Sequence, residues 1–150
     1  MAKKKSKDRS GDILVEIQSI QSLYERLLDK TYSSLGISNE QYNVLDILAS
    51  SDEGMALHQI QVLLSNQTSN TTRLVDKLQS KKLLVKKSNP ADKRRLLITI
   101  TPQGKEVWGS AVKLVTPLNK KIKKGVNSGG SKVLLAELKS LRKVLKAMDL

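Results

Sequence analysis

A run of polar residues that passes into a basic segment, residues 65–87, constrains this chain more than any other feature. Its second half has the spacing of an amphipathic helix, with an apolar face and a cationic face (Leu74, Val75 and Leu78; Arg73, Lys77 and Lys81). Residues 66–72 consist only of Asn, Gln, Ser and Thr, which are mediocre helix formers because their side chains compete for the backbone. Such a local departure from good helix sequence is where function is expected.

The polar half of this segment predicts a surface that reads DNA. If Asn66 is the N-cap, the first two turns present hydroxyl and amide groups at Thr68, Ser69 and Thr72. Such groups suit base edges, and the cations that follow suit phosphates. The pattern is typical of a recognition helix. A polar loop or a capped helix start that binds nothing would explain the same residues, so the interpretation depends on the rest of the chain.

The charge of the chain is large and unevenly distributed. The formal net charge is +13 over 150 residues. Eight acids and two bases between positions 12 and 53 give −6, whereas nine bases and two acids between positions 73 and 95 give +7. A basic block beside an acidic region indicates a patch for a polyanion, although a solvated run of charge is the simpler alternative.

Several classes of function are excluded or disfavoured by composition. The chain has no cysteine, which excludes disulfides and thiolate metal sites within it. His58 is the only histidine, and no Gly-rich phosphate loop or nucleophile motif is present, so we expect neither an enzyme nor a metal site nor a cofactor. No stretch resembles a signal peptide or a membrane span, which predicts a cytoplasmic protein without a membrane partner.

The order of the remaining elements predicts a helix-turn-helix. Apolar residues at helical spacing indicate a first helix from position 11 or 12 to about 33. Ser38 and Gln41 form a capping box that starts a second helix, and Met55-Ala56 could add a very short strand. A third, two-turn helix over residues 57–64 is separated from the polar-to-basic segment by a tight turn at residues 65–66. A short helix, a turn and an amphipathic helix make this motif.

A two-stranded wing and two further helices follow. Residues 83–85 and 96–100 are β-rich and flank a basic segment with a turn at residues 88–90. Thr101 and Pro102 begin a helix as N-cap and first residue, which Pro117 should kink or interrupt near Val115. Residues 127–130 predict a break. A last helix then carries one apolar stripe (Leu134, Leu138, Leu141, Leu145 and Met148).

The fold class that we expect is mainly α with a small β-wing. Residues 1–10 form a basic, flexible tail, and residues 11–150 form one domain. Within it, a winged helix-turn-helix over residues 38–101 is flanked by helices at residues 11–34 and 102–150. The apolar stripes of these outer helices exceed what the small winged core can cover, so we expect them to dimerise with a second copy.

With these elements assigned, the chain resembles the MarR family of winged helix-turn-helix regulators over roughly residues 38–106. The similarity lies in the second helix, the recognition helix, the wing and the start of the next helix (residues 41–45, 72–78, 89–94, 98–101 and Gly104). It implies an obligate homodimer whose first, fifth and sixth helices interlock. It also implies that recognition helices enter major grooves of double-stranded DNA and wings enter flanking minor grooves, as expected of a transcriptional regulator at an inverted-repeat operator.

The resemblance also suggests residue roles. Arg94 resembles the wing arginine that enters the minor groove, and Asp92 the carboxylate that holds it. Ser69 and Asn70 sit where family members vary, and Gln61, Asn70 and Thr71 depart from the commoner residues, so the operator cannot be copied from relatives. The expected DNA-binding residues are Thr68, Ser69, Asn70, Thr72, Arg73, Lys77, Lys93, Arg94 and Arg95.

Three aspects of function stay open at the level of sequence. Repression is the expected mode, because no activation or enzyme domain is recognisable, but activation is compatible with the same sequence. Family members often bind small aromatic or phenolic effectors between the dimer helices and the winged domain, and no residue here identifies one. A nonspecific architectural or RNA-binding protein is the alternative, and it would bind without sequence preference.

Overall fold

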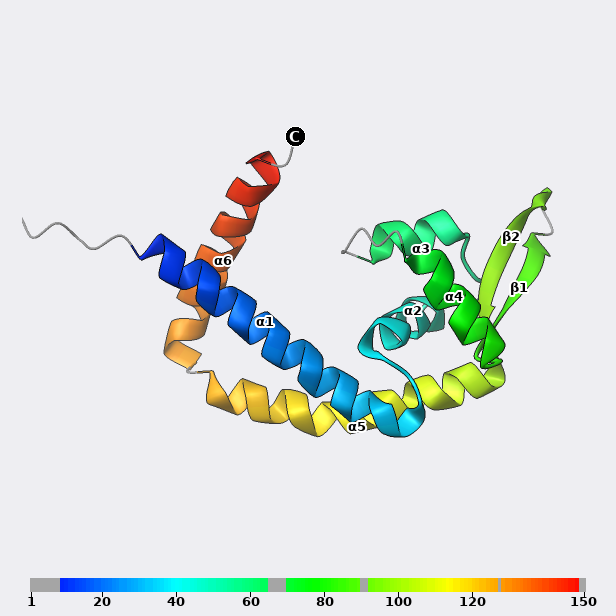
Figure 1. Cartoon of the computed structure of the whole chain (residues 1–150), viewed down its shortest axis with the longest axis horizontal. Helices are drawn as coiled ribbons and strands as arrows, with labels where there is room; N and C mark the ends of the chain where they lie inside the picture. Colours follow the sequence, from blue (N-terminus) through cyan, green and yellow to red (C-terminus); the bar gives the residue numbers. More distant parts are fainter. Residues whose placement is uncertain (1–8, 65–69, 90–91, 127, 149–150) are drawn as a thin grey trace, which may run out of the picture. The chain divides into compact units, whose positions relative to one another are not determined.

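The computed structural model describes residues 9–64, 70–89, 92–126 and 128–148 (Figure 1). The elements are the helices α1 (Ser10–Tyr32), α2 (Asn39–Ala49), α3 (Leu57–Leu63), α4 (Thr71–Ser80), α5 (Pro102–Gly125) and α6 (Ser128–Met148), a 3₁₀ turn η1 (Ser33–Leu35), and the strands β1 (Leu84–Asn89) and β2 (Asp92–Ile100). The predicted class, mainly α with a small β-wing, is confirmed. The chain divides into two compact units, residues 1–114 and 115–150, and α5 crosses the division.

The core of the first unit is built around α2. This helix contacts α1, α3, α4 and β2. Its inward residues Val44, Leu45 and Leu48 are fully buried, and Ile60 of α3 and Leu78 of α4 are buried with them. Because each fully buried aliphatic side chain contributes about 1.5 to 3 kcal/mol, this cluster supplies much of the stability of the unit.

The start of α2 follows the predicted capping box. The Ser38 hydroxyl accepts a hydrogen bond from the Gln41 backbone N–H at 3.2 Å, and Gln41 Oε1 accepts one from the Ser38 N–H at 3.2 Å. The pair satisfies two backbone donors that the helix itself cannot satisfy. Gln41 is buried despite its polarity, with 5% of its surface exposed, so the cap lies inside the fold.

The wing is an antiparallel hairpin in which Leu84 pairs with Ile100 and Asn89 with Asp92. Met55 adds one bridge to this sheet, since its N–H and C=O each bond to Ile98, at 3.0 and 2.8 Å. The very short strand expected at Met55 is therefore a single bridge. It fixes the base of the wing next to the helix-turn-helix.

The start of α5 is tied to the loop between α4 and β1. Thr101 Oγ1 accepts a hydrogen bond from the Gly104 N–H at 3.0 Å, which confirms Thr101 as the N-cap, and donates one to the Lys82 carbonyl at 2.8 Å. A Cβ at Gly104 would lie 2.0 Å from the Leu83 carbonyl oxygen. Only glycine allows the helix to approach the loop this closely.

Two expectations for the C-terminal half are only partly right. Pro117 does not interrupt α5, which continues to Gly125, because a proline removes one backbone bond while the bonds on either side hold the helix. The predicted break between the last two helices is present between Gly125 and Ser128, but Gly129 and Gly130 belong to the first turn of α6, although each glycine costs about 1 kcal/mol in a helix. The good helix formers of residues 132–148 outweigh that cost.

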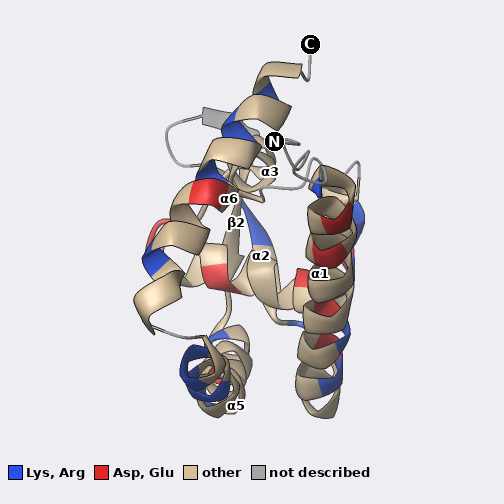
Figure 2. Ribbon diagram, turned by 90° about the vertical axis from the view of Figure 1, so that its left-hand side faces the viewer, with Lys and Arg blue, Asp and Glu red and all other residues tan. Residues whose placement is uncertain are grey.

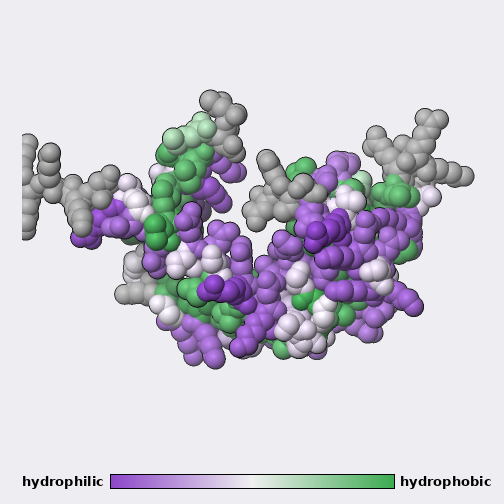
Figure 3. All heavy atoms as spheres, in the orientation of Figure 1, coloured by the Kyte–Doolittle hydropathy of each residue, from purple (hydrophilic) through white to green (hydrophobic). Residues whose placement is uncertain are grey.

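Apolar and charged side chains are separated along the outer helices. Acidic residues recur along α1, whereas Lys123 and Lys124 are part of a basic end of α5 (Figure 2). Apolar residues run along α6 in full view of solvent (Figure 3). The exposed apolar residues of α6 are Val133, Leu134, Leu135, Leu138, Val144, Leu145 and Met148.

Candidate nucleic-acid interface

The recognition helix begins later than the sequence predicts. Asn70, and not Asn66, is the N-cap residue, and α4 starts at Thr71. The predicted contact residues Thr68 and Ser69 lie outside the described residues. Thr71, one of the departures from the expected family pattern, has only 1% of its surface exposed.

The two faces of α4 separate as the sequence predicts. Leu74, Val75 and Leu78 are buried, whereas Arg73 and Lys77 are exposed. Thr72 is also exposed and lies one residue before Arg73. The helix therefore presents a hydroxyl and two cations on a surface that the rest of the unit does not cover, which is the composition expected where a protein meets bases and phosphates.

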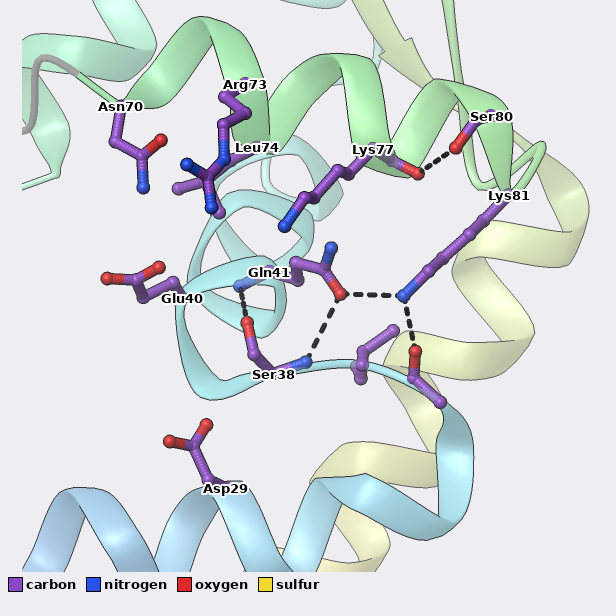
Figure 4. A pocket seen from close by; sticks show the side chains of 12 residues that line it. Asp29, Ser38, Glu40, Gln41, Asn70, Arg73, Leu74, Lys77, Ser80 and Lys81 are labelled. Carbon is purple, nitrogen blue, oxygen red and sulfur yellow. Dashed lines mark hydrogen bonds between the residues drawn. The ribbon is translucent and has the colours of Figure 1, made fainter.

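Arg73 and Lys77 extend from α4 toward the start of α2, beside a hollow of about 700 Å³ (Figure 4). Residues from α1, α2 and α4 line it, with three cations (Arg73, Lys77 and Lys81) and two carboxylates (Asp29 and Glu40). Because Arg73 and Lys77 are exposed, these long side chains have room to turn toward a polyanion without disturbing the core.

The end of α4 is held to the start of α2 by polar contacts that the sequence analysis missed. Lys81 Nζ donates to Gln41 Oε1 at 2.9 Å and to the Gly36 carbonyl oxygen (Figure 4). Asp29 of α1 accepts a hydrogen bond from the Asn39 N–H at 2.7 Å. The capping-box pattern identified Gln41 as part of a helix start. No sequence pattern showed that its side-chain oxygen also accepts a hydrogen bond from Lys81 of α4.

The wing carries the other predicted contact residues. The backbone of Asp92, Lys93, Arg94 and Arg95 forms the tip-proximal half of β2, and their side chains lie outside the part that the structure describes. The contact expected between Asp92 and Arg94 therefore remains a prediction.

An ion pair connects the wing to the recognition helix. Lys86 Nζ of β1 lies 2.6 Å from Asp76 Oδ1 of α4. Both side chains are partly exposed, so the pair contributes at most about 1 kcal/mol. It nevertheless neutralises one cation of the basic block, so fewer cations remain for phosphates than the sequence count suggests.

A second polar contact links α2 to α5. Trp108 Nε1 donates to Asp46 Oδ1 at 2.8 Å, and the Tyr42 hydroxyl donates to the same oxygen at 3.4 Å. Burial, together with the Asp46 carboxylate, raises the pKa of Tyr42, and burial raises the pKa of Tyr32. Trp108 is half-buried and lies against α2.

No alternative chemistry competes with this surface within the described residues. His58 is exposed at the start of α3. Within the described ranges, no group of three or more His, Cys, Asp or Glu side chains is placed to hold a metal ion. Among the helices that the structure describes, none combines the length and apolar character that crossing a membrane requires.

A short helix, an amphipathic helix that follows it and a two-stranded hairpin, in this order, define a winged helix-turn-helix protein. The sequence model of the MarR family matches residues 35–95, which include α2, α3, α4, β1 and the first four residues of β2. Solved structures of this family share the fold over nearly the full chain. Residues 35–95 of this chain therefore match the MarR-family sequence pattern, and the chain has the MarR winged-helix fold.

Three solved structures illustrate the similarity. A MarR-like transcription regulator from Bacillus cereus ATCC 10987 is 20% identical, with a TM-score of 0.81 over 91% of this chain and 98% of that one. A mutant MarR from E. coli complexed with operator DNA is 25% identical, with a TM-score of 0.76 over 91% and 99%. CouR from Rhodococcus jostii RHA1 bound to p-coumaroyl-CoA is 22% identical, with a TM-score of 0.75 over 91% and 95%. No curated protein matches the chain by sequence.

Proposed function

We propose that this chain is a sequence-specific, double-stranded DNA-binding transcriptional regulator that acts in the cytoplasm as a homodimer on an inverted-repeat operator, as a repressor and not as an enzyme. The observation that carries the proposal is the exposed face of α4, where Thr72, Arg73 and Lys77 stand opposite a fully buried apolar face. The MarR structure from E. coli that contains operator DNA supports the same use of the fold.

The roles of the individual residues follow from their chemistry. Thr68, Ser69, Asn70 and Thr72 would contact base edges in the major groove, because hydroxyls and amides both donate and accept hydrogen bonds there. Cations would hold the phosphates and the minor groove (Arg73, Lys77, Lys93, Arg94 and Arg95). Asp92 would orient Arg94 at the wing tip through a charge-assisted hydrogen bond.

The dimer would use residues 11–34 and 102–150, which flank a winged domain over residues 38–101. Large apolar side chains stay exposed on both α1 and α6, with 56% of Ile20 and 54% of Leu134 accessible. Their number is unusual for a single chain and typical of surfaces that a partner covers. In a homodimer the second copy supplies the same apolar surface, so the two surfaces cover each other and no further copy is needed.

We also propose that a small molecule regulates DNA binding. CouR, which shares the fold, was solved with p-coumaroyl-CoA bound, and this supports effector binding as a property that the fold allows. The chemical class that this chain would accept is not part of the proposal, because no side chain that the structure describes selects one class over another.

Selection of bound sequences from a random DNA pool, at two salt concentrations, tests the proposal. We expect one inverted repeat to be preferred over random DNA by about a thousandfold or more. Equal affinity for all sequences, with a steep salt dependence, would instead establish the nonspecific basic binder that the net charge of +13 favours as an alternative.

Two variants separate the wing from the helix in the same assay. Arg94→Ala should weaken operator binding by about 1 to 3 kcal/mol per subunit and flatten the salt dependence, because a cation leaves the interface. Asn70→Ala is the neutral counterpart, which should relax base preference at one position per half-site and leave the salt slope unchanged. Tighter operator binding by Asp92→Ala would show that simple charge governs the wing.

A further inference from the structure

All aromatic side chains of this chain are confined to α1, α2 and α5. The 150 residues include three tyrosines, one tryptophan and no phenylalanine. Tyr32 of α1 and Tyr42 of α2 stack with ring centroids 4.6 Å apart and an interplanar angle of 19°. Trp108 of α5 shares the carboxylate of Asp46 with Tyr42, and Tyr24 of α1 lies near enough to both stacked tyrosines to affect their ionisation. Elsewhere the core is aliphatic.

Asp46 is the polar centre of this cluster. It is an exposed residue of α2, and its Oδ1 accepts hydrogen bonds from Trp108 Nε1 at 2.8 Å and from the Tyr42 hydroxyl at 3.4 Å. The indole N–H can only donate and the carboxylate can only accept, so the direction of the bond is fixed. The bond to Trp108 is short and charge-assisted, whereas the bond to Tyr42 is long and weak.

This contact falls at a mechanically important point of α5. The start of the helix is fixed by Thr101 and by the close approach of Gly104 to Leu83. Trp108 adds a second attachment about 6 Å further along the helix axis, at 1.5 Å per residue from Gly104. Buried Ala111, about one turn further on, shows that apolar packing also holds this part of α5. Such packing is non-directional, whereas the hydrogen bond of Trp108 specifies one direction of the helix axis. Because α5 continues as one helix into residues 115–125, the direction of its start also determines the direction of those residues.

We propose that Asp46 is a positioning residue that, through Trp108, fixes the direction of α5 relative to α2 and thereby sets the half-site spacing that the dimer accepts. The proposal rests on the proposed function, since spacing has meaning only for a dimer on an inverted repeat. In such a dimer the outer helices join the two winged domains, so the direction in which α5 leaves one domain determines where the second recognition helix lies. Asp46 itself touches neither base nor phosphate in this role.

The first experiment measures the direction of α5 without DNA. The chain contains no cysteine, so Gln79→Cys on α4 and Lys113→Cys on α5, both exposed positions, accept spin labels at these two sites alone. Labelled chain diluted with excess unlabelled chain reports the distance distribution within one subunit. We expect a narrow distribution in the parent protein and a broader one in Asp46→Ala and in Trp108→Phe, which keeps a ring but loses the donor.

Two control variants separate positioning from loss of charge or fold. Asp46→Asn keeps an acceptor oxygen and should restore the narrow distribution. Asp52→Ala removes the same charge from an exposed turn and should leave the distribution unchanged. Equal widths in the parent protein, Asp46→Ala and Trp108→Phe would overturn the proposal. Circular dichroism checks that every variant has the parent helix content.

The second experiment uses operators whose half-sites are separated by one base pair fewer or more than the selected spacing. We expect the preference of the parent protein for the selected spacing to fall about tenfold in Asp46→Ala and Trp108→Phe, the factor that one charge-assisted hydrogen bond corresponds to. Affinity for random DNA should stay constant. A broader distance distribution with unchanged spacing preference would overturn the proposal. A parent protein without any operator preference would contradict the proposed function instead, while the label distances still decide whether Asp46 positions α5.

Discussion

The recognition helix α4 and the last helix α6 have the same kind of sequence pattern but opposite surroundings. Both are amphipathic, with leucines on one face and cations on the other. In α4 the apolar residues Leu74, Val75 and Leu78 have at most 5% of their surface exposed, whereas in α6 Leu134 and Leu145 have 54% and 49% exposed. A helical apolar stripe therefore predicts that a face will be buried, but not which molecule buries it.

The difference follows from the neighbours that each helix has. α4 packs with α2, α3 and β1 within one compact unit. α6 shares its unit only with the second half of α5, and Val115 is the one buried apolar residue among the described residues of 115–150. The apolar face of α6 is thus available for association, and the comparison predicts that damage to the two helices will have different consequences.

The largest expected effect is on association. Leu138→Glu should convert the dimer to monomer, because a carboxylate desolvated in an apolar interface costs several kcal/mol and each 1.4 kcal/mol corresponds to about a tenfold change in the dissociation constant. Lys139→Glu places the same carboxylate on the cationic side of α6, one turn from Arg142 and Lys143, and should leave the dimer intact. Sedimentation equilibrium at micromolar concentration measures both variants. A dimeric Leu138→Glu protein would show that α6 is not covered by a second copy.

The next effect is on the stability of the winged unit. Leu78→Ala should lower the free energy of unfolding by about 2 to 5 kcal/mol, since it leaves a cavity in a fully buried site. Leu134→Ala should cost much less within the chain and should act mainly on association. Denaturant unfolding at two protein concentrations separates the two cases, because only a loss in the dimer contact changes with concentration. If both variants lost the same unfolding free energy at both protein concentrations, the apolar faces of α4 and α6 would not differ in what buries them.

A smaller effect is expected at the start of α5. Gly104→Ala should destabilise the chain by about 1 to 3 kcal/mol, because the new methyl group would lie 2.0 Å from the Leu83 carbonyl oxygen. Gly109→Ala is the matched control on the same helix. Nothing lies within 4 Å of its added methyl group, so the substitution should stabilise the helix by about 0.5 to 1 kcal/mol. Thermal unfolding of both variants checks the sign of each effect, and a Gly104→Ala protein as stable as its parent would show that α5 does not need the close approach.

The smallest effect is a pH dependence confined to the first unit, which contains every tyrosine. Burial raises the pKa of Tyr32 and Tyr42 above the unfolded value of about 10. Above pH 10 the unfolded chain therefore releases protons that the folded chain retains, so stability is present below pH 10 and is lost as pH rises beyond it. Each affected tyrosine contributes at most about 1.4 kcal/mol per pH unit.

Tyr32→Phe and Tyr42→Phe provide the check on this pH dependence. Each should flatten the loss of unfolding free energy between pH 10 and 11 relative to the parent chain. Lysine deprotonation contributes equally to all three proteins and cancels in the comparison. An alkaline loss of stability as steep in both variants as in the parent would show that tyrosine burial does not govern it.

Much of the fold could be predicted because its signals are local. Ser38 with Gln41, Thr101 with Pro102, and the β-rich runs around the wing each specify an element within a few residues, and the structure confirms all three elements. The bounds of the wing differ, because β1 continues through Ser88 and Asn89, where the sequence predicts a turn. The start of α4 could not be located in this way. Asn66 and Asn70 are both acceptable N-caps by residue type, and Asn70 precedes the helix without a side-chain cap hydrogen bond, so residue type alone does not mark the start.

In the candidate site, too, local spacing could be predicted from the sequence and contacts between distant residues could not. Sequence spacing brought Arg73, Lys77 and Lys81 to one side of the recognition helix, because four residues make about one turn. It gave no sign that Lys81 is held by Gln41 and Gly36, which lie about forty residues earlier in the chain. Polar partners at such separations carry no periodic signal, and therefore the sequence counted Lys81 only as a cation.

The sequence by itself determined the class of this protein: its helices, its wing, its basic recognition segment and its lack of thiol chemistry. These features depend on residue type and short-range spacing, which the chain carries in any conformation. Only the tertiary structure decided which side chains meet. It paired Asp46 with Trp108 across 62 residues and continued α5 past Pro117, because such outcomes depend on the sum of packing and hydrogen bonds over several elements and not on any one of them.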